Sequence, residues 1–311
     1  MRHEARNIKN PPIPPFFKGG RGGIILLLAS CFLLLSSCSL RKPATAITAD
    51  TLTRGMIAVE SESDVFVARE SALSLIKILD VLHYGNPKNK KFLGLLAKAY
   101  GNYAFGLAEL EGMKGGAEEW ISRAKRFYAK GRDYGIAALS TGKTSIAEIP
   151  LNKFEKNLKR FSKKDVPTLF WTAFSWGSYI NMSRDDIVAA ADLPRVQALV
   201  DRALELEPEF QCGVTYAFKG ALLAGNPFLT GSKPEMAKPY FEKALDACNG
   251  AYLMTKVMYA EWYLNTIGDK VAFKKALEEV ITADASVLPQ QRLANELAKE
   301  RARMLFRIFL K

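Results

Sequence analysis

The chain has 311 residues, of which 49% are hydrophobic, and its 44 basic and 32 acidic side chains give a formal net charge of +12. This composition excludes a disordered chain and is sufficient for a large buried core. Two histidines and four cysteines are a poor supply for histidine-based catalysis or for a clustered zinc site. We therefore expect a folded protein that is not an enzyme and that has no metal site and no cofactor.

The N-terminal segment has the pattern of an export signal. Residues 24–35 form an apolar run that is shorter than the roughly 20 residues of a membrane-spanning helix. The run ends at Leu35, and two serines and Cys38 come next, as in the processing site of bacterial lipoproteins, where the cysteine is lipidated and becomes the mature N-terminus. We predict a signal peptide over 1–37, a lipid anchor at Cys38 and a periplasmic location, with Ser39 favouring the outer membrane. The alternative is an ordinary signal peptide with an incidental cysteine.

The charge of the mature chain is modest and scattered. Removal of residues 1–37 takes away five basic residues and one acid, which leaves an excess of about eight positive charges. No block of five like charges is present. We therefore expect no binding of nucleic acid.

Two cysteines of the mature chain, Cys212 and Cys248, have no role in the anchor. In an oxidising compartment they could pair, or they could be two buried thiols on neighbouring helices. We favour unpaired thiols, because a large helical core does not need a crosslink.

Apolar residues recur at helical spacing along the mature chain, and no segment alternates like a strand. We expect a tether over 38–50 and one helical domain over 51–311. The short connections contain Gly, Pro, Asn or Ser, which predicts antiparallel neighbours. The predicted helices are 51–84, 89–113, 117–140, 145–161, 167–181, 185–190, 194–207, 210–224, 234–247, 253–266, 270–283 and 289–309.

Two consecutive helix pairs have the spacing of tetratricopeptide repeats, with residues inserted between their helices. We therefore predict an all-α fold of paired antiparallel helices that form a degenerate tetratricopeptide-like superhelical domain. The first pair has Ala173, Trp176, Gly177 and Ile180, then Val196, Val200 and Ala203; the second has Tyr216, Lys219, Gly220 and Leu223, then Ala237, Phe241 and Ala244.

Aromatic side chains gather on the helix predicted at 167–181, on more than one of its faces. Either this helix is buried on all sides, or one face lines a cavity for an apolar or amphipathic ligand, with further rings from neighbouring repeats. The candidate lining residues are Phe170, Trp171, Phe174, Trp176, Tyr179, Tyr216, Trp262 and Tyr263.

A loop with Pro and Gly precedes the helix predicted at 234–247, and its apolar residues could dock a partner or could cap the core. The candidate partner residues are Asn226, Pro227, Phe228 and Leu229.

Several stretches of the chain together resemble the T-component lipoproteins of tripartite ATP-independent periplasmic (TRAP) transporters. The resemblance implies tetratricopeptide-like lipoproteins that form homo-oligomers, with a trimer expected, and that enclose a pore or cavity in each protomer. It also implies binding to the periplasmic substrate-binding protein of the transporter, and it brings no catalytic residues. The stretches are YGNYAFGLAELEG (100–112), FWTAFSWGSYINMS (170–183), ADLPRVQALVDRALELEPEF (191–210), the region 220–233 followed by AKPYFEKAL (237–245), MTKVMYAEWYLN (254–265) and RLANELAKERARMLF (292–306).

Together these observations predict a lipid-anchored accessory component of a TRAP system. It would bind the substrate-binding protein and hold or channel a small apolar or amphipathic organic ligand. The alternative is a general cell-envelope scaffold lipoprotein with tetratricopeptide-like repeats and no ligand.

Overall fold

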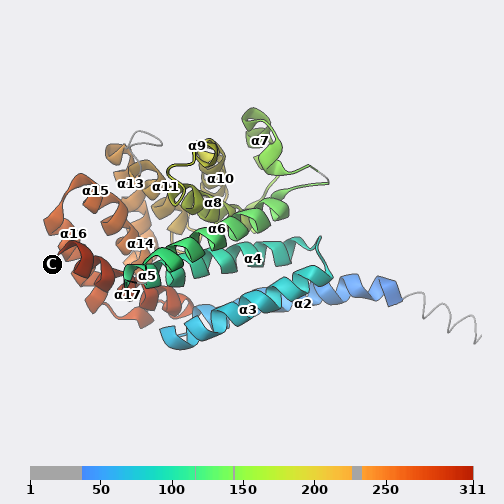
Figure 1. Ribbon diagram of the computed structural model, residues 1–311, viewed down its shortest axis with the longest axis horizontal. Helices are drawn as coiled ribbons and strands as arrows, with labels where there is room; N and C mark the ends of the chain where they lie inside the picture. Colours follow the sequence, from blue (N-terminus) through green and yellow to red (C-terminus); the bar gives the residue numbers. More distant parts are fainter. Residues whose placement is uncertain (1–36, 116, 143, 226–232, 311) are drawn as a thin grey trace, which may run out of the picture. The chain divides into compact units, whose positions relative to one another are not determined.

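The structure is a computed structural model that describes residues 37–115, 117–142, 144–225 and 233–310. Throughout this part of the chain the regular elements are helices, with no strand, as the sequence predicted (Figure 1). A boundary after Thr48 separates a first unit from residues 49–311, which contain the cavities and the charged cluster described below.

The first predicted helix, 51–84, is in fact two helices, α2 (Ser37–Glu60) and α3 (Val65–Gly85). The prediction missed the break at residues 61–64, which contain neither Gly nor Pro. It also placed the helix start too late, since α2 runs through residues 38–50, which we expected as a tether before the first helix. Three residues of this segment, Ala44, Ala46 and Ala49, favour helix propagation, whereas Pro43 opposes it.

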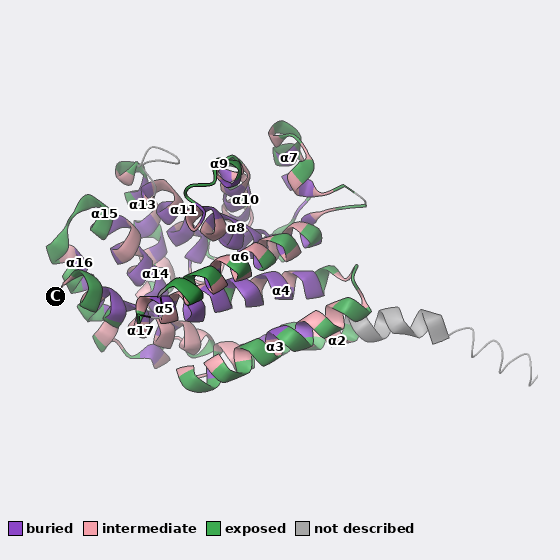
Figure 2. Ribbon diagram, viewed as in Figure 1, coloured by how far each residue is buried: buried purple, intermediate pink, exposed green. Residues whose placement is uncertain are grey.

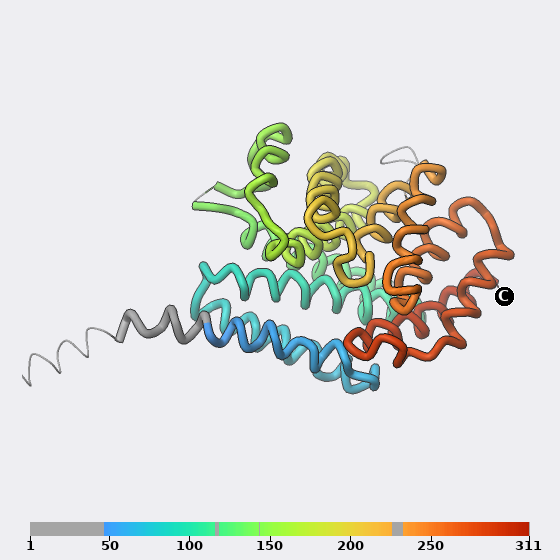
Figure 3. The backbone as a smooth tube through the Cα atoms, turned by 180° about the vertical axis from the view of Figure 1, so that it is seen from behind, coloured from blue at the N-terminus to red at the C-terminus, as the bar shows by residue number. Residues whose placement is uncertain are grey.

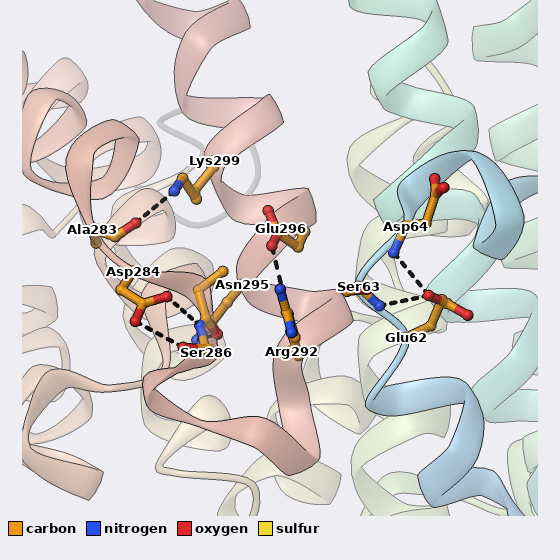
Figure 4. A network of polar contacts seen from close by, with 11 residues as sticks. Glu62, Ser63, Asp64, Ala283, Asp284, Ser286, Arg292, Asn295, Glu296 and Lys299 are labelled. Atoms are coloured by element: carbon orange, nitrogen blue, oxygen red, sulfur yellow. Dashed lines mark hydrogen bonds and ion pairs between the residues drawn. The ribbon is translucent and has the colours of Figure 1, made fainter.

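Side chains of the break itself satisfy the backbone groups that are exposed there. Glu62 Oε1 accepts hydrogen bonds from the N–H groups of Ser63 and Asp64, at 2.7 and 2.8 Å (Figure 4). Asp64 then caps α3 by accepting from the N–H groups of Phe66 and Val67. Such an N-cap contributes about 1 kcal/mol, so Glu62 and Asp64 stabilise the turn and the start of the next helix.

The other helices agree with the predicted boundaries to within a few residues, apart from short 3₁₀ turns at 146–148, 163–165, 247–250, 285–287 and 289–291. Two π-helical segments, η1 and η5, interrupt helices that the sequence predicted as continuous. The order is α4 (Lys90–Tyr103), η1 (Ala104–Ala108), α5 (Glu109–Met113), α6 (Ala117–Leu139), α7 (Leu151–Leu158), α8 (Val166–Asn181), α9 (Ile187–Ala190), α10 (Leu193–Leu206), α11 (Val214–Ala224), α13 (Pro234–Asp246), α14 (Leu253–Met258), η5 (Tyr259–Leu264), α15 (Asn265–Ile267), α16 (Lys270–Thr282) and α17 (Arg292–Phe309).

Glycines on α4 and α6 allow both helices to lie close to α8. A methyl group in place of the hydrogen of Gly101 or Gly131 would lie 2.7 or 2.5 Å from Ser175 Oγ. At Gly135 it would lie 2.2 Å from Thr172 Oγ1 and 3.0 Å from Thr172 Cα, so there even the backbone of α8 is in contact. Both hydroxyl residues are fully buried, and α4 and α8 are mostly buried along their length (Figure 2). The three helices therefore pack at a separation that only glycine permits.

The two predicted helix pairs pack as expected, α8 with α10 and α11 with α13. A methyl group on Gly177 would lie 3.2 Å from Val196 Cγ1, and one on Gly220 would lie 2.7 Å from the Phe241 ring. Of the predicted contact positions on the second helices, Val196, Val200, Ala203, Ala237, Phe241 and Ala244 are all fully buried.

The prediction of unpaired thiols was wrong, because Cys212 and Cys248 form a disulfide with Cα atoms 5.3 Å apart. The turn before α11 and the turn after α13 bring the two residues together. Both turns use left-handed backbone at non-glycine residues, with φ of 43° at Gln211, 56° at Cys212, 50° at Cys248 and 54° at Asn249. The disulfide therefore joins two turns whose backbone is strained.

The end of the chain returns to helices near its beginning. The helix α17 packs against α14 and α16, and it also contacts α3 and α5 (Figure 3). Gln291 Nε2 donates to Glu60 Oε2 at 2.8 Å, and Lys98 pairs with the same carboxylate. These contacts join α2, α4 and the start of α17.

A fully buried amide, Asn295 on α17, holds the connection between α16 and α17 (Figure 4). Its Nδ2 donates to the carbonyl oxygens of Ala251 and Ala285, at 2.9 and 3.2 Å. Its Oδ1 accepts from the N–H of Leu253 at 2.9 Å. Because the bonds to Leu253 and Ala285 are buried, losing the amide would leave buried backbone groups unsatisfied. Asn295 therefore fixes α17 relative to α14.

Candidate ligand cavity

The larger of two cavities, of about 340 Å³, lies among α5, α8, α11, α14 and α17, and the smaller one, of about 130 Å³, lies among α2, α3, α4, α8, α14 and α17. Their walls are mostly apolar. Phe105, Phe174 and Met258 line both of them and therefore form the partition between them. The Phe105 and Phe174 rings meet edge to face, with centroids 5.4 Å apart. The two cavities are thus neighbouring chambers that three side chains separate.

Both π-helical segments supply residues to the wall of the larger cavity. In η1, the N–H of Glu109 donates to the carbonyl of Ala104, five residues earlier, and in η5 the N–H of Asn265 donates to Ala260 in the same way. A π turn holds one residue more than an α turn, and it therefore changes the direction of the side chains that follow. Phe105 and Glu109 reach the cavity at η1, and Glu261 and Trp262 reach it from η5.

Arg301 of α17 binds two carboxylates at the wall of the larger cavity, where its side chain is 5% exposed. Its Nε and Nη2 donate to Glu261 Oε2 and Oε1 at 2.7 and 2.8 Å, which is a bidentate pair. Nη2 also donates to Glu109 Oε2 at 2.9 Å, and the Tyr128 hydroxyl donates to Glu109 Oε1 at 2.6 Å. The guanidinium lies 4.3 Å from the centre of the Phe105 ring.

Burial governs the protonation of this cluster. It raises the pKa of Glu109, and Arg301 and Tyr128 only partly oppose that shift. Burial and the charge of Glu109 together raise the pKa of the Tyr128 phenol well above its ordinary value. For Arg301, burial lowers the pKa, but the two carboxylates outweigh burial and raise it. Arg301 and Tyr128 therefore keep their protons, whereas burial disfavours the ionised form of Glu109.

Half of the predicted aromatic residues line the cavities. Phe170 and Trp171 line the smaller one, Phe174 lines both, and Trp262 lines the larger one. Phe170 stacks on Phe174 with ring centroids 5.8 Å apart, and Trp171 meets both rings edge to face. One face of α8 thus forms an aromatic wall. Phe218 of α11 extends it, with its ring 5.2 Å from that of Phe174.

The other four predicted residues lie elsewhere. Trp176 is buried and lines a shallow surface depression beside α6. The guanidinium of Arg132 lies over the ring of Tyr179, 4.4 Å from the centre of that ring. Tyr216 and Tyr263 pack against rings of their neighbours, Tyr240 for the former and Tyr259 and Phe241 for the latter. The structure therefore does not gather all eight rings around one space.

The predicted partner residues Asn226, Pro227, Phe228 and Leu229 lie outside the described residues, as do residues 1–36 of the predicted signal peptide. Cys38 falls within α2. Among the residues that the structure does describe, no helix combines the length and the apolar character needed to cross a bilayer. The same residues contain no group of His, Cys, Asp or Glu side chains suited to a metal ion.

Sequence reasoning missed the charged cluster of Arg301, Glu109 and Glu261. Each of these residues sits in a stretch that was singled out, namely YGNYAFGLAELEG, MTKVMYAEWYLN and RLANELAKERARMLF. The available signal was a charge among apolar neighbours on one helix face, because charged side chains are rarely buried without a partner.

Comparison with known proteins agrees with the predicted family. A protein of Treponema pallidum (strain Nichols), described as uncharacterized, is 22% identical over 301 residues, which cover 89% of this chain and 93% of the relative. The family model described as TRAP transporter T-component matches residues 61–308. This range contains the lining residues of both cavities except for Met56, Val59, Glu60 and Phe309, and it contains the whole charged cluster. The chain therefore belongs to the TRAP transporter T-component family.

Proposed function

We propose that this protein holds or passes a small apolar or amphipathic organic molecule for a TRAP transporter and docks on the substrate-binding protein of that system. Family membership makes the chain an accessory component of such a system, with a location in the cell envelope. The observation that supports a ligand is the pair of apolar chambers with a common aromatic partition.

The dimensions of the chambers support this proposal. A volume of about 340 Å³ lies within the roughly 300–1,000 Å³ of small-molecule sites, and such sites combine apolar walls with a few polar groups. The second chamber, of about 130 Å³, is large enough to accept part of a chain-like ligand. A ligand that moved from one chamber to the other would have to displace Phe105, Phe174 or Met258.

We further propose that the α8–α10 and α11–α13 pairs are tetratricopeptide-like units and that the chain forms a homo-oligomer, with a trimer as the expected form. Apolar side chains exposed on α3 support an interface with other copies, since Phe66 is 68%, Val81 70% and Tyr84 87% exposed. The lipid anchor at Cys38 and the docking loop that contains Phe228 belong to the same proposal.

The test is purification of the full chain from solubilised membranes, with analysis of its protein and small-molecule content. Ala221 lines the larger cavity, so Ala221→Phe fills it, while Ala272→Phe on α16 adds the same ring at an open surface depression and is the matched control. We expect all three proteins to recover a TRAP substrate-binding protein. We expect an organic ligand by mass spectrometry in wild type and Ala272→Phe only.

Each part of the proposal has its own refuting result. The same small molecules in Ala221→Phe as in wild type would exclude the cavity as the ligand site. Recovery of unrelated lipoproteins or wall enzymes, without a substrate-binding protein or a ligand, would favour the general scaffold. Mass spectrometry of the N-terminal peptide should find an acylated Cys38, and a mature chain with an unmodified Cys38 would exclude the anchor.

A further inference from the structure

We propose that the ligand of the larger cavity is an organic ammonium compound with an apolar tail, whose head binds beside Glu109 and Glu261. This inference rests on the proposed ligand-holding function and adds the chemical class of the ligand. It is carried by the charges and the unfilled hydrogen-bonding capacity of the groups that line the cavity.

The first step is the charge of the wall. Of the described residues that line the larger cavity, Arg301 is the one cation, and Glu109 and Glu261 are the two acids. With both acids ionised the cluster carries one excess negative charge beside apolar and aromatic walls. A buried excess charge is unfavourable unless a counter-charge joins it. A cationic ligand would supply that counter-charge.

The second step is the direction of the hydrogen bonds. The guanidinium fork of Arg301 is already occupied, because Nε and Nη2 donate to Glu261 and Nη2 also donates to Glu109. Its Nη1 points to the carbonyl oxygen of Phe105, at 3.4 Å. A ligand carboxylate would therefore find only Nη1 to bind and would place a third carboxylate beside the two acids. Each carboxylate oxygen, by contrast, has capacity for a further donor, since it has two lone pairs and accepts one of these bonds.

The third step is the rest of the wall. The Phe174, Phe218 and Trp262 rings line the same cavity as the carboxylates. Aromatic faces attract cations by their quadrupole, and they also bury the apolar part of a ligand. A primary ammonium group suits this combination, because it offers donors to the carboxylates while its chain contacts the rings. Burial raises the pKa of Glu109, which means that its ionised form is disfavoured. A nearby ammonium group would stabilise that ionised form, so this effect also favours a cationic ligand.

The experiment compares three probes with the same tail, decylamine, decanol and decanoate, by titration calorimetry at pH 7 below their micelle concentrations. The protein is the full chain carrying Cys38→Ser, so that no acyl chain competes for the cavity. We expect decylamine to bind about tenfold more tightly than decanol, and decanoate to bind more weakly than decanol. Glu109→Gln should bring decylamine to the affinity of decanol and leave decanol unchanged.

The control is Glu300→Gln, one residue before Arg301 on α17, where the carboxylate pairs with Lys114 outside the cavity. It should leave all three affinities unchanged. Equal binding of amine and alcohol, or tightest binding of decanoate, would overturn the inference while leaving the ligand-holding function intact. If none of the three binds, the ligand-holding function itself fails. If Glu109→Gln does not fold, the affinities of decylamine, decanol and decanoate for the protein without cavity substitutions still test the inference.

Discussion

Reduction of the Cys212–Cys248 disulfide should destabilise the fold by about 2–3 kcal/mol. The crosslink closes a loop with a sequence separation of 36, for which chain entropy gives about 4 kcal/mol of stabilisation. The left-handed residues at both of its turns cost roughly 1 kcal/mol each or more, and part of that strain relaxes once the turns separate. The net loss is therefore smaller than the loop alone predicts.

Urea denaturation of oxidised and reduced protein measures this loss. With a slope of about 3 kcal/mol per molar urea, the midpoint should fall by about 1 M on reduction. The double variant Cys212→Ala/Cys248→Ala should have the midpoint of the reduced protein and should not respond to reductant. An unchanged wild-type midpoint, or non-reducing peptide maps in which residues 212 and 248 are not joined, would refute the reasoning.

Two further substitutions test the packing and the electrostatics. Gly135→Ala should destabilise the fold by about 1–3 kcal/mol, because its methyl group meets the backbone of α8. Gly55 is exposed on α2 and a methyl group there would have no atom within 4 Å, so Gly55→Ala should stabilise the fold by about 0.5–1 kcal/mol. If the urea midpoints of both variants shift in the same direction relative to wild type, the close packing of α6 against α8 at Gly135 is contradicted. Burial raises the pKa of Asp80, but hydrogen bonds from Tyr100, Tyr134 and Lys77 outweigh it and hold the pKa below its ordinary value of 3.8. Asp80 therefore stabilises the fold above pH 3.8 and loses this effect as the pH falls further, so Asp80→Asn should cost about 1 kcal/mol at pH 7 and progressively less below pH 3.8. A gap between wild type and variant that stays constant down to pH 2 in denaturation curves would exclude this role.

Helix positions were predictable because hydrophobic periodicity and turn residues act locally. The segment predicted as one helix at 89–113 is helical over 90–113, yet it contains the π turn η1. A shift of one residue hardly alters the apolar pattern of a helix that is buried on several sides, so periodicity cannot detect it. For the same reason the sequence could not distinguish Phe174, which faces the cavities, from Trp176, which does not.

The disulfide and the charged cluster depend on contacts between distant parts of the chain. Cys212 meets Cys248 only because the turns beside α11 and α13 adopt left-handed backbone, and neither turn has glycine at the cysteine itself. Arg301 reaches Glu109 across 192 positions of sequence. Local patterns contain no information on such pairs, so only the packing of α17 against α5 brings them together.

The two π turns also bear on how cavities of this kind diversify during evolution. Each turn holds a single surplus residue, so deletion of one codon in η1 would restore α-helical geometry and rotate Glu109 by about 100° relative to the preceding helix. A deletion in η5 would re-aim the residues beyond it in the same way. Single-codon insertions and deletions in descendants of this gene could therefore change which side chains face the cavity, without replacing any of those side chains.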